Sequence, residues 1–156
     1  MSFSDVAADL RRTIDAALPI LQSLSEADAD TPRAPGKWTP KQVIGHLIDS
    51  AANNHQRFVR AQLGTELVSP SYAQDHWVEC QAYASRRWRD LTTFWHTYNT
   101  HLAHVIERIP DDRARVRCTI GANQPVTLTF LAEDYVAHLK HHLMQANASL
   151  SYDVQR

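Results

Sequence analysis

Residues 84–109, ASRRWRDLTTFWHTYNTHLAHVIERI, decide the fold of this chain. Apolar side chains recur in them at alternating steps of four and three residues, at Ala84, Trp88, Leu91, Trp95, Tyr98, Leu102, Val105 and Ile109. That spacing lines them up in one stripe along a helix, and a stripe of this length is typical of a bundle helix. Pro110 follows directly and predicts the end of the helix.

A shorter stripe of the same kind lies near the N-terminus. Its apolar members are Val6, Leu10, Ile14, Ala17, Leu21 and Leu24. Ser2, with Asp5 three residues later, predicts a helix cap, because the two side chains can bond each other's backbone N–H. Pro19 falls inside the pattern and predicts a kink or an early break there.

A third helix is predicted to begin after the loop SEADADTPRAPGKW. Thr39 stands at the cap, Pro40 at the first helical position and Gln42 three residues after Thr39, which together form a strong start signal. The helix is expected to continue to about residue 63 or 64.

The segment RVRCTIGANQPVTLTF has a different pattern. Val116, Cys118 and Ile120 alternate with polar residues and a turn-forming GANQP follows, which predicts a short hairpin or extended loop. A last helix is expected from about residue 127 to residue 150.

Four helices of this length predict an all-α fold, an antiparallel four-helix bundle with its longest connections after the first and third helices. The 156 residues suit a single domain, 1–156. The formal net charge of -1 and the lack of Lys/Arg runs argue against a nucleic-acid partner. No apolar run approaches the ~20 residues of a membrane span. The N-terminus does not resemble a secretory signal and the two cysteines show no CxxC spacing, so a cytoplasmic location is expected.

The nine histidines are the main oddity of the composition. His138 and His142 are four residues apart, so on a helix they lie one turn apart on one face and can reach the same ion. His141 could replace His142 in that pair, although it would point further toward solvent. The alternative is two unrelated histidines that share a face.

A third ligand has to come from another helix. His46 lies at the edge of the apolar stripe of the second long helix, whereas His55 is expected to face water. A histidine at the place of His46 is either a core residue or a ligand. Three neutral imidazoles would suit Zn²⁺ or Ni²⁺ and would leave one coordination position free.

Acidic residues near these histidines can serve the site. Asp49, three residues after His46, could orient that ring or act as a catalytic general base. Asp134 precedes His138 by one turn and could orient it, and Gln145 could bond a ligand. Each of them could equally be a solvated surface residue.

Three separate segments of the sequence, KWTPKQVIGHLIDSAANNHQRF, SYAQDHWVE and GANQPVTLTFLAEDYVAHLKHHLMQ, carry a family resemblance. Together they resemble the YfiT-like branch of the DinB-like superfamily, over most of the chain from Arg33 onward. The resemblance implies an up-down-down-up bundle that holds one divalent metal ion at its open end, through His46, His138 and His142. Members are often homodimers.

For function, the resemblance implies a metal-dependent enzyme acting on a small molecule. The first expectation is a thiol S-transferase, which joins a low-molecular-weight thiol such as bacillithiol or mycothiol to an electrophile through a metal-bound thiolate. One alternative is a metal-dependent hydrolase that uses metal-bound hydroxide. The other is a non-catalytic metal-binding dimerisation bundle.

Overall fold

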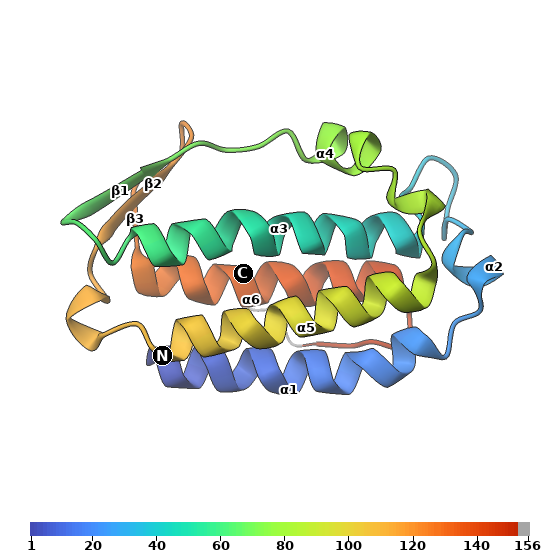
Figure 1. The fold of residues 1–156 in the computed structure, drawn as a ribbon, viewed down its shortest axis with the longest axis horizontal. Helices are drawn as coiled ribbons and strands as arrows, with labels where there is room; N and C mark the ends of the chain where they lie inside the picture. The colour runs from blue at the N-terminus through green and yellow to red at the C-terminus, as the bar shows by residue number, and fades with distance from the viewer. Residues whose placement is uncertain (153–156) are drawn as a thin grey trace.

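The structure, a computed structural model, describes residues 1–152. Its four long helices are α1 (Phe3–Gln22), α3 (Pro40–Arg60), α5 (Trp88–Glu107) and α6 (Leu128–Ala146). The colour gradient in Figure 1 shows that α1 and α6 run in one direction along the bundle while α3 and α5 run in the other. The expected up-down-down-up bundle is therefore confirmed.

The predicted helix starts are confirmed by side-chain caps. Ser2 and Asp5 form a capping box at α1, and Thr39 and Gln42 form another at α3. At Pro19 the expected early break does not occur, because α1 continues to Gln22. So close to the C-terminal end, the proline removes one of the last backbone hydrogen bonds and leaves the earlier turns intact.

The predicted boundaries of the other helices are slightly too wide. α3 ends at Arg60, α6 ends at Ala146, and α5 begins at Trp88 because Tyr83–Ser85 form a separate 3-10 turn. Two further short elements were not predicted, namely α2 (Glu26–Ala29) in the first loop and a 3-10 turn at Asp111–Arg113.

The prediction that the longest connections follow the first and third helices was wrong. The longest one, residues 61–87, joins α3 to α5. Because these two helices run in the same direction, the chain has to return along the whole length of the bundle between them (Figure 1). On its way back it forms β1 (Glu66–Ser69) and α4 (Gln74–Cys80), and α4 lies alongside α3.

The predicted hairpin is present between α5 and α6. It consists of β2 (Arg117–Ile120) and β3 (Val126–Thr127), which pair antiparallel. An unpredicted third strand, β1, pairs parallel with β2, with Leu67 opposite Cys118. The small sheet lies at the end of the bundle where α3 ends and α6 begins (Figure 1).

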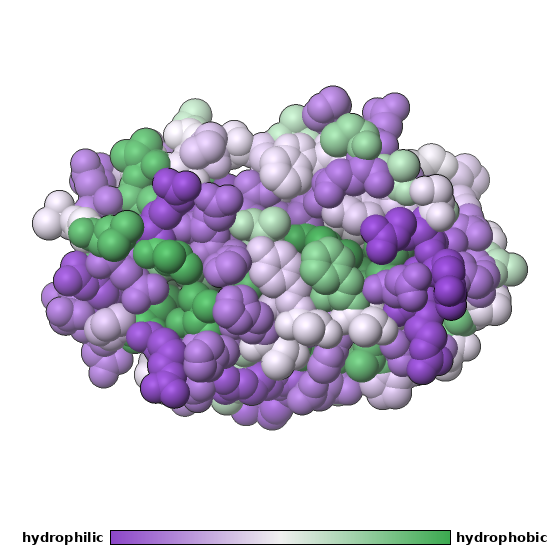
Figure 2. All heavy atoms as spheres, in the orientation of Figure 1, coloured by the Kyte–Doolittle hydropathy of each residue, from purple (hydrophilic) through white to green (hydrophobic). Residues whose placement is uncertain are grey.

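The core runs along the bundle axis and contains large, fully buried side chains, among them Phe58 on α3, Trp95 on α5 and Leu139 on α6. On the face drawn in Figure 2, hydrophobic side chains show only in patches among hydrophilic ones. Within residues 1–152, no helix has the length and apolar character needed to cross a membrane.

Candidate metal centre

Three histidines from two helices meet inside the bundle. His46 on α3 and His138 and His142 on α6 each offer a ring nitrogen, and these nitrogens all lie within 4.8 Å of one another. The Nε2 atoms of His46 and His138 are 3.3 Å apart. Two ligands about 2.0–2.1 Å from one tetrahedral ion would be separated by roughly 3.3 Å, so this pair already has a suitable spacing.

Helix packing brings the three rings together. α3 and α6 pack against each other, and His138 and His142 follow one another by a single helical turn, with ring centroids 4.4 Å apart. His46 is completely buried, and the ring of Trp38 lies against it with centroids 5.1 Å apart. The triad therefore lies between the two helices, with Trp38 covering one side.

The surroundings keep the three imidazoles neutral. Burial, followed by the proximity of His142 and His138, lowers the pKa of His46 to about 3. Burial, followed by the proximity of His142 and His141, lowers the pKa of His138 to about 4, and burial also lowers the pKa of His142. A neutral imidazole keeps the lone pair that a metal ion needs.

A glutamine on α6 makes hydrogen bonds with both of the adjacent histidines. The Nδ1 atom of His142 donates a hydrogen bond to Oε1 of Gln145 (2.8 Å), which leaves Nε2 of His142 free as an acceptor. The Nε2 atom of Gln145 donates a hydrogen bond to Nε2 of His141 (3.1 Å), which is not a member of the triad. The ring of His142, in contrast, lies 4.5 Å from that of His46 and 4.4 Å from that of His138, centroid to centroid.

Asp49 is buried beside the site and is bonded to other residues than expected. Its Oδ1 atom accepts hydrogen bonds from the hydroxyl of Tyr83 (2.6 Å) and from Nε2 of Gln81 (2.7 Å). Within residues 1–152, its Oδ2 atom and Nδ1 of His46 have no hydrogen-bond partner. Asp49 therefore does not orient His46 in this structure, but ties the segment after α4 to α3.

Asp134, the other predicted partner, lies on the exposed rim of a small cavity that His138 also lines. Burial by the surrounding atoms nevertheless raises the pKa of its carboxyl group. His55, expected to face water, is half-buried and makes a hydrogen bond of 3.1 Å with the hydroxyl of Tyr98.

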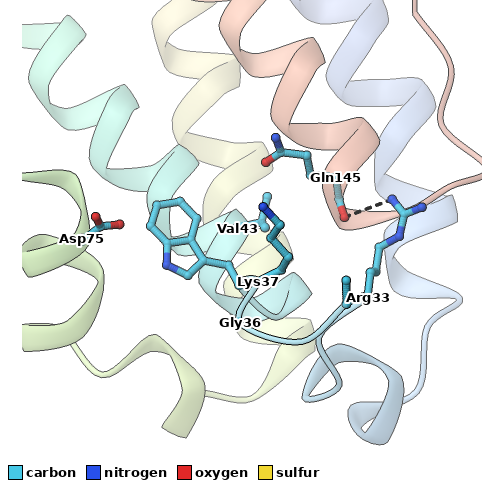
Figure 3. Close-up of a pocket in the computed structure, with 8 residues that line it drawn as sticks. Arg33, Gly36, Lys37, Val43, Asp75 and Gln145 are labelled. Carbon is cyan, nitrogen blue, oxygen red and sulfur yellow. Dashed lines mark hydrogen bonds between the residues drawn. The ribbon is translucent and has the colours of Figure 1, made fainter.

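A larger pocket, of about 560 Å³, lies next to the triad at the start of α3, and we call it the mouth pocket. Trp38, which contacts His46, and Gln145, which bonds His142, both line it. In Figure 3, Arg33 and Lys37 extend from the loop before α3 on the same side as Gln145, while Asp75 lies across from them on α4. The mouth pocket therefore adjoins the triad through Trp38 and Gln145, and two cationic side chains lie in its wall.

The residues present fit a divalent ion. They supply three neutral nitrogen donors within 4.8 Å of one another, of which one pair is already 3.3 Å apart. One of these donors is already oriented by a hydrogen bond to its other nitrogen. The cluster of potential ligands has three members among the residues that the structure describes, so it would not fill a tetrahedral ion by itself.

Comparison with known proteins gives consistent results. The model of the DinB superfamily matches residues 9–146. A protein of Geobacillus thermodenitrificans, named as a candidate metal-dependent hydrolase, is 27% identical over 142 residues, which are 88% of this chain and 78% of the relative. A protein of Bacillus mycoides with the same kind of name is 32% identical over 59 residues, covering 38% of this chain and 34% of its own length.

Among solved structures, the fold is similar to that of YfiT from Bacillus subtilis, described as a probable metal-dependent hydrolase with an unusual four-helix bundle topology. The TM-score is 0.77 at 20% identity, over 96% of this chain and 83% of YfiT. At that identity the likeness establishes the shared fold.

Proposed function

This chain belongs to the DinB superfamily, and we propose that it is a metal-dependent hydrolase whose ion is held by His46, His138 and His142. The observation that carries the proposal is the triad of neutral imidazoles, one buried and two half-buried, with two Nε2 atoms 3.3 Å apart. The names of the relatives from Geobacillus and Bacillus support hydrolysis as the reaction.

A Zn²⁺ or Ni²⁺ ion held by three neutral ligands keeps its full charge and can bring the pKa of a bound water to about 7. The protein's own part is to hold and orient. His46, His138 and His142 would supply the ligand atoms, and Gln145 fixes His142 in the tautomer with Nε2 free. Because these side chains are packed between two long helices, the site needs little rearrangement before it binds.

The mouth pocket is the natural place for the substrate. It has room for a small molecule, its apolar part is formed by Trp38 and Val43, and Lys37 and Arg33 bring positive charge to one side (Figure 3). Arg33 is anchored, because its Nη1 atom donates to the carbonyl oxygens of Met144 (2.6 Å) and Gln145 (3.2 Å). A substrate in this pocket would lie against the residues that contact His46 and His142.

Transfer of a low-molecular-weight thiol is the second candidate. The same three neutral ligands would stabilise a bound thiolate as well as a hydroxide, so the triad serves both reactions. The names of the relatives favour the hydrolase. A purely structural ion is less well supported, because the cluster offers three protein ligands rather than four.

The two reactions are separated by one assay. The protein, loaded with one equivalent of Zn²⁺ or Ni²⁺, is incubated with a panel of carboxylic esters, amides and lactones without thiol, and then with bacillithiol or mycothiol and monochlorobimane. Turnover without thiol that disappears in His142→Ala supports the hydrolase. Turnover that requires thiol in every case rejects it in favour of the transferase.

A further inference from the structure

A second, smaller cavity lies on the other side of the triad from the mouth pocket. It has a volume of about 180 Å³ and lies between α3 and α6, covered by the chain that leads into α4. His138 lines it together with the polar residues Ser50, Asn54, Arg57, Tyr72, Gln74 and Asp134. A ligand of the proposed ion therefore forms part of its wall.

Arg57 is the unusual member of this cavity. It is only 7% exposed, and none of the carboxylates in residues 1–152 forms an ion pair with it. Its Nη1 and Nη2 atoms donate to Oδ1 of Asn54 (3.4 Å) and to the carbonyl oxygen of Pro70 (3.2 Å). Its Nε atom is buried without a partner among those residues. A buried cation without a counter-charge destabilises the fold, because no nearby negative charge offsets the free energy of removing the guanidinium from water.

The other groups in the cavity favour an anion as the missing partner. Burial, the largest cause, raises the pKa of Tyr72 to about 12, so its hydroxyl keeps its proton and can donate. Asp134 stands on the exposed rim of the cavity, and burial by the surrounding atoms raises the pKa of its carboxyl group. Burial lowers the pKa of Arg57, and a bound anion would offset that effect. The planar guanidinium, with unused N–H groups, suits an oxyanion.

The position of the cavity relates it to the proposed reaction. Ser50, in its wall, is one helical turn, about 6 Å along the axis, from His46. The side chain of Arg57 bends back toward the start of α3, as its bond to Asn54 shows. A group held by Arg57 would therefore lie a short distance along the α3–α6 groove from the triad, with the mouth pocket on the opposite side.

We propose that this cavity is an oxyanion subsite, in which Arg57 binds a carboxylate or phosphate group of the substrate. That the bound molecule is a substrate rests on the proposed function, whereas the binding of an anion by Arg57 does not depend on it. The hydrolysed bond would then lie between the anionic group and the part of the molecule that occupies the mouth pocket. The favoured substrate class is small esters or amides that carry an acidic group.

The test is calorimetric titration with sodium phosphate and with sodium acetate, on zinc-loaded and on metal-free protein. The variants are Arg57→Met, which removes the charge, and Arg57→Lys, which keeps the charge but loses the planar fork. Arg60→Met is the matched control, because Arg60 lies one turn further along α3 and is exposed. Circular dichroism verifies that each variant is folded, and elemental analysis gives its metal content.

We expect at least one of the two anions to bind in both metal states. Arg57→Met should weaken that binding about tenfold or more, Arg57→Lys by less, and Arg60→Met should leave it unchanged. Should Arg57→Met not fold, Arg57→Lys and Arg60→Met still give the comparison. The preferred anion then distinguishes a carboxylate from a phosphate substrate.

Two results would overturn the subsite. One is the absence of binding by wild-type protein, which would mean that water alone fills the cavity. The other is binding of equal strength in the Arg57 variants, or binding that needs zinc and ignores Arg57. Anion binding that depends on Arg57 in a protein that takes up no metal would instead reject the hydrolase and leave the subsite standing.

Discussion

The Nε2 atoms of His46 and His138 lie 3.3 Å apart, although the two residues are 92 positions apart in the chain. Both rings are neutral because burial lowers their pKa values to about 3 and about 4. At 3.3 Å one of the two rings can donate a hydrogen bond to the other, and an ion bound between them and His142 would take the place of that shared proton. Several consequences of this arrangement can be measured.

The metal-free protein should lose stability in mild acid. Below about pH 6.5, histidines of the unfolded chain take up protons that buried His46 and His138 bind only near pH 3–4. The unfolded state then binds more protons, so the free energy of unfolding is highest above pH 6.5 and falls toward pH 4. Each histidine contributes up to about 1.4 kcal/mol per pH unit. Urea unfolding at pH 7, 6 and 5 measures the slope.

The control for this prediction is His46→Gln, which removes one of the two groups. Its unfolding free energy should depend less steeply on pH, with a slope reduced by up to about 1.4 kcal/mol per pH unit. An unchanged slope in the variant would show that His46 does not remain neutral in the folded protein.

Gln145 should influence metal affinity although it is not a predicted ligand. Its Oε1 atom accepts the hydrogen bond from Nδ1 of His142 and so fixes the ligand's orientation. Gln145→Leu is expected to weaken zinc binding about 10- to 100-fold, measured by competition with a chelating dye. His141→Ala should keep a stoichiometry of one, because His141 is not a member of the triad. If His141→Ala lost the ion and His142→Ala kept it, His141 rather than His142 would be the third ligand.

Gly45 should not tolerate a methyl group. A Cβ atom there would come within 2.2 Å of the ring of Tyr83, which packs onto α3 at this point. Gly45→Ala is therefore expected to lower the unfolding free energy by about 1–3 kcal/mol. Gly64→Ala is the matched control, because the nearest atom to its added Cβ is at 3.6 Å. Equal stability of the two variants in urea would contradict the close packing of Tyr83.

Asp49 allows a structural role to be separated from a catalytic one. An amide oxygen can still accept from Tyr83 and Gln81, and burial raises the pKa of the Asp49 carboxyl, so Asp49→Asn should change the unfolding free energy by less than about 1 kcal/mol. Tyr83→Phe, which removes one donor, should cost about 1–3 kcal/mol. The metal content of both should stay at the wild-type value. If hydrolysis falls in Asp49→Asn far more than in Tyr83→Phe, Asp49 acts as the general base that the sequence suggested.

Local signals were sufficient to predict much of the fold. The helix starts at Ser2 and Thr39 were predictable because capping depends on residues three positions apart. The pairing of β1 with β2 was not, since Leu67 meets Cys118 only through the folded bundle. The long return between α3 and α5 was missed because the apolar stripe of a helix does not encode its direction.

The candidate site was predictable to a similar extent. The spacing of His138 and His142 indicated a shared face. The place of His46 at the edge of its apolar stripe, together with the family resemblance, added the third member. Gln145 bonds His142 and His141, which precede it by three and four residues, so its partners were within reach of local reasoning. The burial of Arg57 was not predictable, because it depends on the chain around Pro70, 13 residues further on. An arginine near the end of a helix is normally solvated, whereas this one is buried and donates a hydrogen bond to the carbonyl oxygen of Pro70.

The most direct test of the account is the metal content of purified protein, measured by elemental analysis for wild type, His46→Ala and His142→Ala. His101→Ala is the control, an exposed histidine on α5. With all four proteins folded by circular dichroism, we predict about one equivalent of a divalent metal in wild type and His101→Ala, and none in the two triad variants. A folded His46→Ala protein that retains its metal would contradict the site and the hydrolase with it.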